Sequence, residues 1–475
     1  MSYIQFLGAA GTVTGSKHLI HTAGNGATGI QVLVDCGLFQ GKKEWRERNW
    51  QGLPISARDI DCLILTHAHL DHCGWIPRLV KQGFRGPIYA TPATVDLCGV
   101  LLPDSGHLQE EDAAFHNQFK TSKHDPALPL YTEDEAIKSL EYFKPVGFEE
   151  STQVSPELSF RFVHAAHILG SSMAEVTLTN GGRSKHLLFT GDIGRVRDQN
   201  VAPGKVLYSG PQTGESAEIV VMESTYGNRQ HPKNDPRPEL ADLIRKTVGR
   251  GGAVIVPAFA VERTQKFVFM LKELMESGQA PRVPVFCDSP MAIKAVEIFL
   301  KHSEEYSDAT RQLVTKYGSP LNWQGFTFAQ TAEDSKKINA CKFPCVIISA
   351  SGMVTGGRIQ HHLIQRLPDP KNTVIFIGFQ APGTRGFSIK SGAPVVKIFG
   401  QMVPIRAQVT ALEQFSDHAD TPELLEWLRT FKSRPQITYL VHGEPEASSL
   451  LRDAMTKELG WSVQIAQWMQ KVEVS

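Results

Sequence analysis

The densest group of chemically active side chains lies in segment 66–72, which reads Thr-His-Ala-His-Leu-Asp-His. Four of these seven side chains are metal-ligand types. A helix or strand would point such closely spaced groups in different directions, whereas a tight loop can fold His67 and His69 onto one metal ion and Asp71 and His72 onto another. A His-rich surface loop is the alternative, but the apolar run that precedes the segment favours a binuclear metal site.

Two metal ions need more ligands than one loop supplies, and further candidates follow other apolar runs. Asp192 and His442 each come directly after such a run or its turn, and His167 lies in a segment that also contains His164. Taken singly, each could be an ordinary core or surface residue, and His164 is an alternative to His167. Together with the loop, they would complete two sets of ligands at the ends of strands.

Short apolar runs that end in polar or glycine-containing turns recur along the whole chain and predict strands. They are Val32–Val34, Cys62–Leu65, Leu187–Phe189, Ile219–Met222, Ala253–Val256, Val283–Phe286, Val346–Ile348 and Val374–Ile377. Helical patterns such as Trp75–Lys81 and Arg263–Met275 alternate with these runs, which predicts an α/β fold. Two acidic stretches around 108–111 and 132–135 are expected to form surface helices.

Length and composition restrict the class of protein. The chain has 475 residues, 41% hydrophobic and 21% charged, values typical of a globular protein with two or three domains. No apolar run is long enough to span a bilayer, so no membrane contact is expected. Seven cysteines without framework spacing favour a reducing, cytoplasmic location. Cys341 and Cys345 are expected to be thiols, because no second pair accompanies them to form a zinc site.

The order of these groups resembles a known family. The H-x-H-x-D-H loop, with Asp35 before it and further ligand types after it, resembles the metallo-β-lactamase superfamily, an α/β fold whose αββα sandwich holds two zinc ions. The resemblance implies that Asp35 orients a ligand histidine. It implies two Zn²⁺ ions, one held by His67, His69 and His167, the other held by Asp71, His72 and His442, with Asp192 bridging them.

Three more segments resemble the β-CASP branch of that superfamily, which comprises nucleases such as RNase J and the nuclease subunit of the pre-mRNA 3′-end cleavage factor. Glu223 follows a strand, His418 lies in Phe-Ser-Asp-His-Ala-Asp, and His442 lies in Val-His-Gly-Glu. A histidine at the position of His442 is typical of RNA-directed members. The resemblance therefore implies a ribonuclease that acts on single-stranded RNA, with His418 as general acid, Glu223 orienting it, and Asp71 among the catalytic residues.

The resemblance also implies an inserted, Rossmann-like β-CASP domain. The expected domains are 1–227 and 404–475, which form the metallo-β-lactamase domain, and 228–403, which forms the insertion. The prolines in Asn228–Pro238 suit a domain crossing. The insertion contains 23 Lys and Arg against 14 Asp and Glu, a balance of +9, and the remainder therefore has 26 against 35, a balance of −9. A basic insertion would draw a phosphate backbone inwards, although the charge could also be spread over solvated helices.

Two glycine-rich loops in the insertion resemble the family's phosphate-gripping loops: 349–358 runs from a strand into a helix, and 378–386 follows another strand. Backbone N–H groups converge on an anion in such turns, although many glycine turns only redirect the chain. The predicted phosphate contacts are Ser349, Ser351, Gly352, Arg358, Thr384 and Arg385.

Two rival functions are a small-molecule hydrolase on the same fold and a noncatalytic RNA-binding scaffold. The three β-CASP motifs count against the first, and the complete ligand set counts against the second. RNase J types carry a further C-terminal domain, whereas this sequence ends 33 residues after His442, which favours an endonuclease over a 5′ exonuclease. A homodimer is compatible with the sequence.

Overall fold

The computed structural model describes residues 1–23, 29–122, 124–180, 182–195, 217–258, 263–305 and 323–474. The chain divides into two compact units, and the second interrupts the sequence of the first. Unit 1 comprises Met1–Arg197, Gly210–Gln230 and His418–Ser475, and unit 2 comprises Asp198–Ser209 and His231–Asp417.

Unit 1 contains two seven-stranded sheets. The first has the order β22-β1-β2-β3-β4-β5-β6, and its strands are β1 (Tyr3–Phe6), β2 (His18–His21), β3 (Gln31–Val34), β4 (Cys62–Ile64), β5 (Ile88–Ala90), β6 (Phe143–Pro145) and β22 (Lys471–Glu473). The second has the order β21-β20-β11-β10-β9-β8-β7, and its strands are β7 (Thr152–Ser155), β8 (Leu158–His164), β9 (Ser172–Asn180), β10 (Arg183–Phe189), β11 (Ile219–Glu223), β20 (Ile437–Val441) and β21 (Val463–Ile465).

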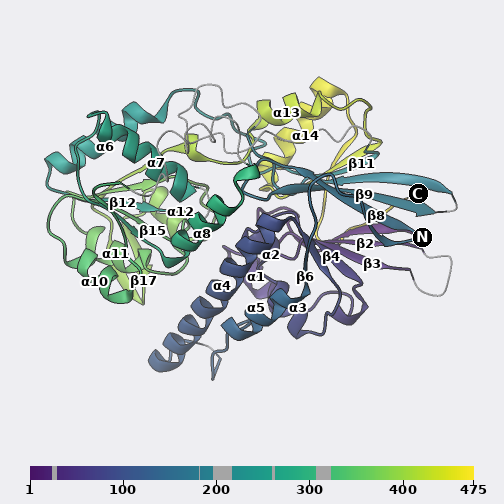
Figure 1. Cartoon of the computed structure of the whole chain (residues 1–475), viewed down its shortest axis with the longest axis horizontal. Helices are drawn as coiled ribbons and strands as arrows, with labels where there is room; N and C mark the ends of the chain where they lie inside the picture. The colour runs from purple at the N-terminus through teal and green to yellow at the C-terminus, as the bar shows by residue number, and fades with distance from the viewer. Residues whose placement is uncertain are drawn as a thin grey trace. The chain divides into compact units, whose positions relative to one another are not determined.

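The two sheets face each other across one apolar core, which includes Phe6 and Val34 from the first sheet and Phe162 and Val221 from the second. The outer face of the second sheet packs on α13 (Thr421–Leu428) and α14 (Pro445–Leu459). The helices beside the first sheet are α1 (Lys43–Arg48), α2 (Leu70–Cys73), α3 (Ile76–Lys81), α4 (Pro92–Phe119) and α5 (Glu133–Ser139) (Figure 1). Unit 1 is therefore the expected αββα sandwich.

The two acidic stretches are helical, as predicted. Residues 108–111 lie in the 28-residue helix α4, and a capping box of Thr132 and Glu135 starts α5. None of the helices in the described part of the chain is both long and apolar enough to cross a membrane.

Unit 2 is built on a six-stranded parallel sheet with the order β14-β13-β15-β12-β16-β19. Its strands are β12 (Val254–Pro257), β13 (Val285–Asp288), β14 (Phe326–Phe328), β15 (Val346–Ser349), β16 (Thr373–Phe376) and β19 (Gln408–Ala411), and a hairpin of β17 (Val395–Ile398) and β18 (Gln401–Pro404) stands beside them. Its helices are α6 (Pro236–Gly249), α7 (Arg263–Glu276), α8 (Pro290–Lys301), α10 (Ala332–Ala340), α11 (Ile359–Arg366) and α12 (Arg385–Lys390).

Helices cover both faces of this sheet, as its strand composition requires. One apolar cluster joins the sheet to α6 and α7, and another joins it to α10 and α11. Strands buried on both faces read as continuous apolar runs, such as Val346–Ser349 with all four residues buried. This doubly wound arrangement is the Rossmann-like architecture expected for the insertion.

Among the described residues, the units differ in two places from the predicted domain bounds. Residues 228–230 lie in unit 1, although the sequence placed them in the insertion. Residues 404–417 lie in unit 2, although the sequence placed them in the returning part of the first domain. The physical reason is β19, which pairs in parallel with β16 from Thr373↔Gln408 to Phe376↔Ala411. The crossing between Gln230 and His231 lies inside the proline-rich stretch.

Candidate metal centre and its neighbouring histidine

The H-x-H-x-D-H segment forms a tight loop between β4 and α2. His69 is the N-cap residue of α2, so the two residues after it, including Asp71, turn into the helix. The chain after β3 runs against this helix, with Cys36 N donating to His72 O at 2.7 Å. A side chain at Gly37 would place its Cβ 1.6 Å from Asp71 O. The absence of a side chain there lets the two segments pack closely.

The first group of donors contains His67, His69, His167 and Asp192, whose ligand-type atoms all lie within 4.8 Å of one another. His69 Nδ1 lies 3.2 Å from Nε2 of His67 and 3.2 Å from Nε2 of His167. Asp192 Oδ2 lies 3.4 Å from His67 Nε2 and 3.5 Å from His167 Nε2. Three imidazoles and one carboxylate oxygen therefore point at one position.

The second group contains Asp71, His72 and His442, also within 4.8 Å. His72 Nε2 lies 3.2 Å from His442 Nε2, which lies 3.5 Å from Asp71 Oδ2. The other oxygen of Asp192, Oδ1, lies 3.3 Å from His72 Nε2 and 3.3 Å from His442 Nδ1. Asp192 thus stands between the two groups and turns one oxygen towards each.

These donors fit metal ions. Asp192 Oδ1 is buried and accepts no hydrogen bond from the described residues, as expected of an oxygen atom that binds a cation. Burial lowers the pKa of His67 and of His167, which keeps their rings in the neutral form that binds metals. Imidazole nitrogen and carboxylate oxygen are ligands that zinc accepts.

The pKa values of His72 and Asp192 indicate that the site lacks positive charge. Burial disfavours a charged His72, but Asp192 and Asp35 overcome it and raise the pKa of His72 well above its usual value. Burial would likewise raise the pKa of Asp192, but the neighbouring histidines, His442 first among them, hold it well below its usual range. The buried carboxylates therefore attract positive charge to this site, which metal ions can supply.

Asp35 lies behind His72, where the sequence placed an orienting carboxylate. Its Oδ2 accepts from His72 Nδ1 at 2.7 Å, and its Oδ1 accepts from the backbone N–H of Thr66 at 2.9 Å. The hydroxyl groups of Thr66 and Ser16 also donate to this carboxylate, Thr66 Oγ1 to Oδ1 at 2.9 Å and Ser16 Oγ to Oδ2 at 3.1 Å. Ser16 and Thr225, whose hydroxyl lies 3.1 Å from His442 Nδ1, were missed because a lone Ser or Thr gives no signal in the sequence.

His418 and Glu223 form a buried pair next to the first donor group. Nδ1 of His418 lies 3.2 and 3.1 Å from the two carboxylate oxygens of Glu223, and its Nε2 lies 4.0 Å from Asp192 Oδ2. The Ile193 backbone N–H also donates to Glu223. One ring nitrogen is therefore fixed by a carboxylate, while the other faces the candidate metal centre.

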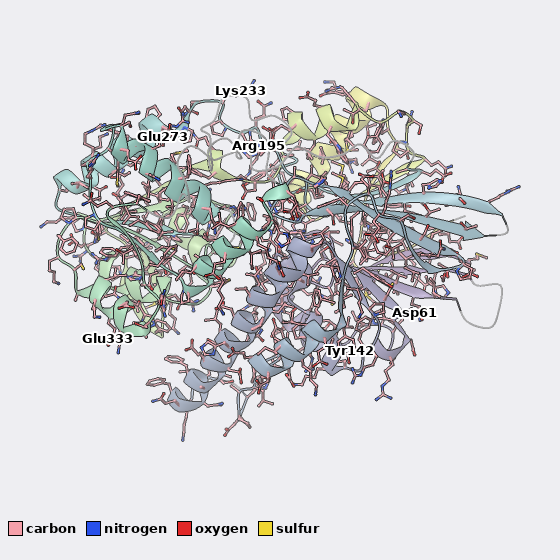
Figure 2. The ribbon with its side chains drawn as sticks, viewed as in Figure 1. Asp61, Tyr142, Arg195, Lys233, Glu273 and Glu333 are labelled. Atoms are coloured by element: carbon pink, nitrogen blue, oxygen red, sulfur yellow. The ribbon has the colours of Figure 1, made fainter. Side chains whose placement is uncertain are left out.

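The chain segments that carry Asp192 and His418 are tied together. Ala419 N donates to Ile193 O at 2.8 Å, and Arg195, labelled in Figure 2, donates from Nε to both carboxylate oxygens of Glu423 at 2.8 Å. Because Glu423 also caps the start of α13, these contacts fix the direction in which His418 enters the site.

His164, the alternative ligand, is not part of either donor group. Its ring stacks on Phe148 with 3.5 Å between the ring centroids. The structure thus brings together the seven expected ligands and leaves His164 in an aromatic contact. Cys345 is a buried free thiol and Cys341 a partly exposed one.

The predicted phosphate-binding residues lie in unit 2, where several already have partners. Arg358 Nη1 pairs with buried Asp288 at 2.8 Å and also donates to a backbone carbonyl. Arg385 Nε donates to the Lys397 carbonyl at 2.9 Å. The remaining four share this pattern of local hydrogen bonds, which involve Ser349 Oγ with Asp288 O, Ser351 Oγ with Thr355 Oγ1, Gly352 O with Gln380 Nε2, and Thr384 as the N-cap of α12. Their contact with phosphate stays a prediction.

Comparison with known proteins identifies the class. Residues 26–225 match the metallo-β-lactamase superfamily, 264–389 match the β-CASP domain, and 402–466 match the Zn-dependent metallo-hydrolase RNA specificity domain. The chain therefore belongs to the β-CASP nucleases of the metallo-β-lactamase superfamily, as its motifs indicated.

Two relatives illustrate how far the similarity extends. The chain is similar to Ribonuclease TTHA0252 of Thermus thermophilus, with 34% identity over 98% of this chain and 99% of that protein. It is also similar to the transcription termination factor FttA of Methanosarcina mazei, with 32% identity over 90% of this chain and 66% of that protein.

Proposed function

We propose that this protein is a zinc-dependent ribonuclease that hydrolyses phosphodiester bonds within single-stranded RNA. The observation that carries the proposal is the His418–Glu223 pair, whose outer nitrogen lies 4.0 Å from the carboxylate between the two donor groups. A hydrolase of small esters has no need of a buried acid at that position, whereas phosphodiester cleavage expels an alkoxide that must be protonated.

The two donor groups would hold two zinc ions, and Asp192 would offer one oxygen to each group. When bound, the ions would supply a nucleophile at neutral pH and neutralise charge on the attacked phosphate. Asp71 would add its carboxylate to the second group, where Oδ2 lies 3.5 Å from His442 Nε2, and is proposed as one of the catalytic residues. Asp35 fixes the ring orientation of His72 and so the direction of its Nε2 lone pair.

The proton step belongs to His418. Glu223 accepts a hydrogen bond from Nδ1 and thereby directs a proton on Nε2 towards the candidate centre. That proton would pass to the 3′ oxygen as its bond to phosphorus breaks, which leaves a 3′-hydroxyl on one product and a 5′-phosphate on the other. Glu223 then stabilises the ring while it regains a proton from solvent.

RNA as the substrate is supported by two comparisons. The C-terminal part of the chain matches an RNA specificity domain, and the relative from Thermus thermophilus that aligns over nearly the whole chain is named a ribonuclease. A noncatalytic scaffold is the weaker candidate, because all seven donor side chains are present and converge.

The test is digestion of one single-stranded RNA labelled at its 5′ end and, separately, at its 3′ end, by zinc-loaded protein. Internal products from both labels, with 5′-phosphate and 3′-hydroxyl ends, are expected. Release of single nucleotides from the 5′ end would replace the endonuclease with an exonuclease. Absence of cleavage by fully metallated protein would refute the ribonuclease proposal.

A further inference from the structure

Unit 1 carries a row of alternating cations and aromatic rings outside the metal centre. The guanidinium carbon of Arg48 lies 4.0 Å from the centroid of a Trp468 ring and 5.6 Å from that of Phe39. The Phe39 ring also lies 4.7 Å from Lys17 Nζ, which is 5.3 Å from a Trp75 ring. We call these five side chains the cation–aromatic ladder.

The inner end of the ladder is buried and rigid. Phe39, Lys17 and Trp75 are all buried, and Lys17 Nζ donates to the Gly37 carbonyl. Burial lowers the pKa of Lys17 to about 8. Lys17 follows Ser16, which binds Asp35, and the backbone N–H of Trp75 donates to Cys36 O. The ladder is therefore anchored in the segments that support the second donor group.

The outer end is exposed. The Trp468 side chain is fixed by a 3.2 Å hydrogen bond from Nε1 to Leu7 O and by Arg48, yet the residue is 43% exposed. Trp50, two positions after Arg48, is 52% exposed. The chain has seven tryptophans, all within the described ranges, and these are its two exposed ones. The Trp468 indole is therefore held in place by two contacts and still presents area to water.

The surroundings of this outer end favour a nucleic acid over an apolar partner. Lys42, Lys43 and Arg46 are exposed beside it. Segment 42–48 has four basic and two acidic residues, although the sequence outside 228–403 has a formal balance of −9.

We propose that Trp468, backed by Arg48, is a stacking platform for bases of the RNA strand outside the cleavage site, with Trp50, two positions after Arg48 in the sequence, as a second exposed indole of the same unit. Every base has a π face, so a fixed aromatic ring near cationic side chains binds single strands with little dependence on sequence. The cation behind the ring adds its own attraction and restricts the ring's rotation. The proposal rests on the proposed ribonuclease function and extends it by naming where the strand runs.

The experiment measures steady-state kinetics of the full-length, zinc-loaded protein on two substrates. One is a long single-stranded oligoribonucleotide, and the other is bis(para-nitrophenyl) phosphate, which has no nucleotide chain that extends beyond the cleaved phosphate. Loss of one base stack predicts that Trp468→Ala raises KM for the RNA about 5- to 150-fold. The kcat for RNA and both constants for the small substrate should not change, because the platform binds ground state and transition state alike.

Two variants separate stacking from a structural role. Trp468→Phe keeps an aromatic face and should restore most of the RNA affinity, and Phe119→Ala, which removes an aromatic side chain that is 57% exposed elsewhere in unit 1, should change neither substrate. Equal KM values for wild type and Trp468→Ala would overturn the platform, as would an identical loss on both substrates. The latter pattern would also mark Trp468 as a structural residue.

Cross-linking keeps this test independent of catalysis. Wild-type protein irradiated with RNA that contains a photoreactive uridine should be labelled at Trp468 or Trp50, as read by peptide mass spectrometry. Labelling there in a protein that cleaves no RNA would refute the ribonuclease and retain the platform. Labelling confined to other surfaces would refute the platform, whether or not cleavage occurs.

Discussion

Replacement of His418 by alanine is the most direct probe of the proposed chemistry. The ring is held by both oxygens of Glu223 at 3.2 and 3.1 Å, so the wild-type acid is already oriented before substrate binds. Its Nε2, 4.0 Å from Asp192 Oδ2, lies just outside the donor groups and is not itself needed to hold a metal. The variant should therefore lose proton transfer while it keeps the metals and the affinity for RNA.

The size of the loss follows from the role. General acid catalysis contributes about 10²- to 10⁴-fold, which corresponds to about 3–5 kcal/mol of activation free energy. Single-turnover cleavage with saturating enzyme measures this step without interference from binding. Glu223→Gln should give a smaller defect, because the amide oxygen can still accept the Nδ1 hydrogen bond. His164→Ala is the matched control, since this histidine in the same unit stacks on Phe148 and should leave the rate unchanged.

A substrate with sulfur in place of the 3′ oxygen makes the test specific, because a thiolate leaves with little need of a proton. His418→Ala should cleave this substrate nearly as fast as wild type does. The reasoning fails if the variant loses metal, if it cleaves the ordinary substrate at full rate, or if the sulfur substrate shows the same defect.

Three further predictions concern other parts of the chain. Asp192→Ala should lower the metal content of both donor groups, whereas His442→Ala should lower that of only one. Elemental analysis measures these losses, and equal losses in the two variants would contradict the bridging position of Asp192. Arg358→Ala should lower the free energy of unfolding by about 1–3 kcal/mol in denaturant titrations, because buried Asp288 loses a partner. If stability is unchanged and RNA binding depends less steeply on salt, Arg358 contacts phosphate instead. Burial lowers the pKa of Lys17 from 10.5 to about 8, so between pH 8 and pH 10.5 the folded state binds fewer protons than the unfolded state. Over this pH range, the free energy of unfolding of the wild type should therefore rise relative to that of Lys17→Met. A parallel pH dependence of the two proteins would show that Lys17 titrates normally.

The sequence alone determined the features that short stretches encode. The metal loop was readable because four ligand-type side chains follow an apolar strand, and the α/β class was readable because apolar runs and helical periods alternate. The helix predicted over Arg263–Met275 was readable in the same way, and α7 runs from Arg263 to Glu276. Each of these signals depends on neighbours within a few residues, and local sterics and hydrogen bonding decide them.

The ligands that lie far from the metal loop in the sequence could be assigned to particular metal ions only because the motifs resemble a known family. Nothing local to His442 distinguishes it from other histidines that follow a strand. It lies 370 positions from His72, and the two rings meet because the sheet that contains β20 packs across one core on the sheet that contains β4. The same limitation applies to Asp192, whose two oxygens could be assigned to separate donor groups only once both groups were seen together.

Tertiary structure also decided which charged side chains are already paired. Arg358 and Arg385 stand beside glycine turns, which favoured phosphate contacts, but Asp288, 70 positions before Arg358, and the Lys397 carbonyl bind their guanidinium groups. Conversely, Arg48 and Trp468 are unremarkable in sequence and form the outer end of the ladder in space. Pairing of charges and rings depends on distances across the fold, and these are set by strand register and core packing, which no local pattern records.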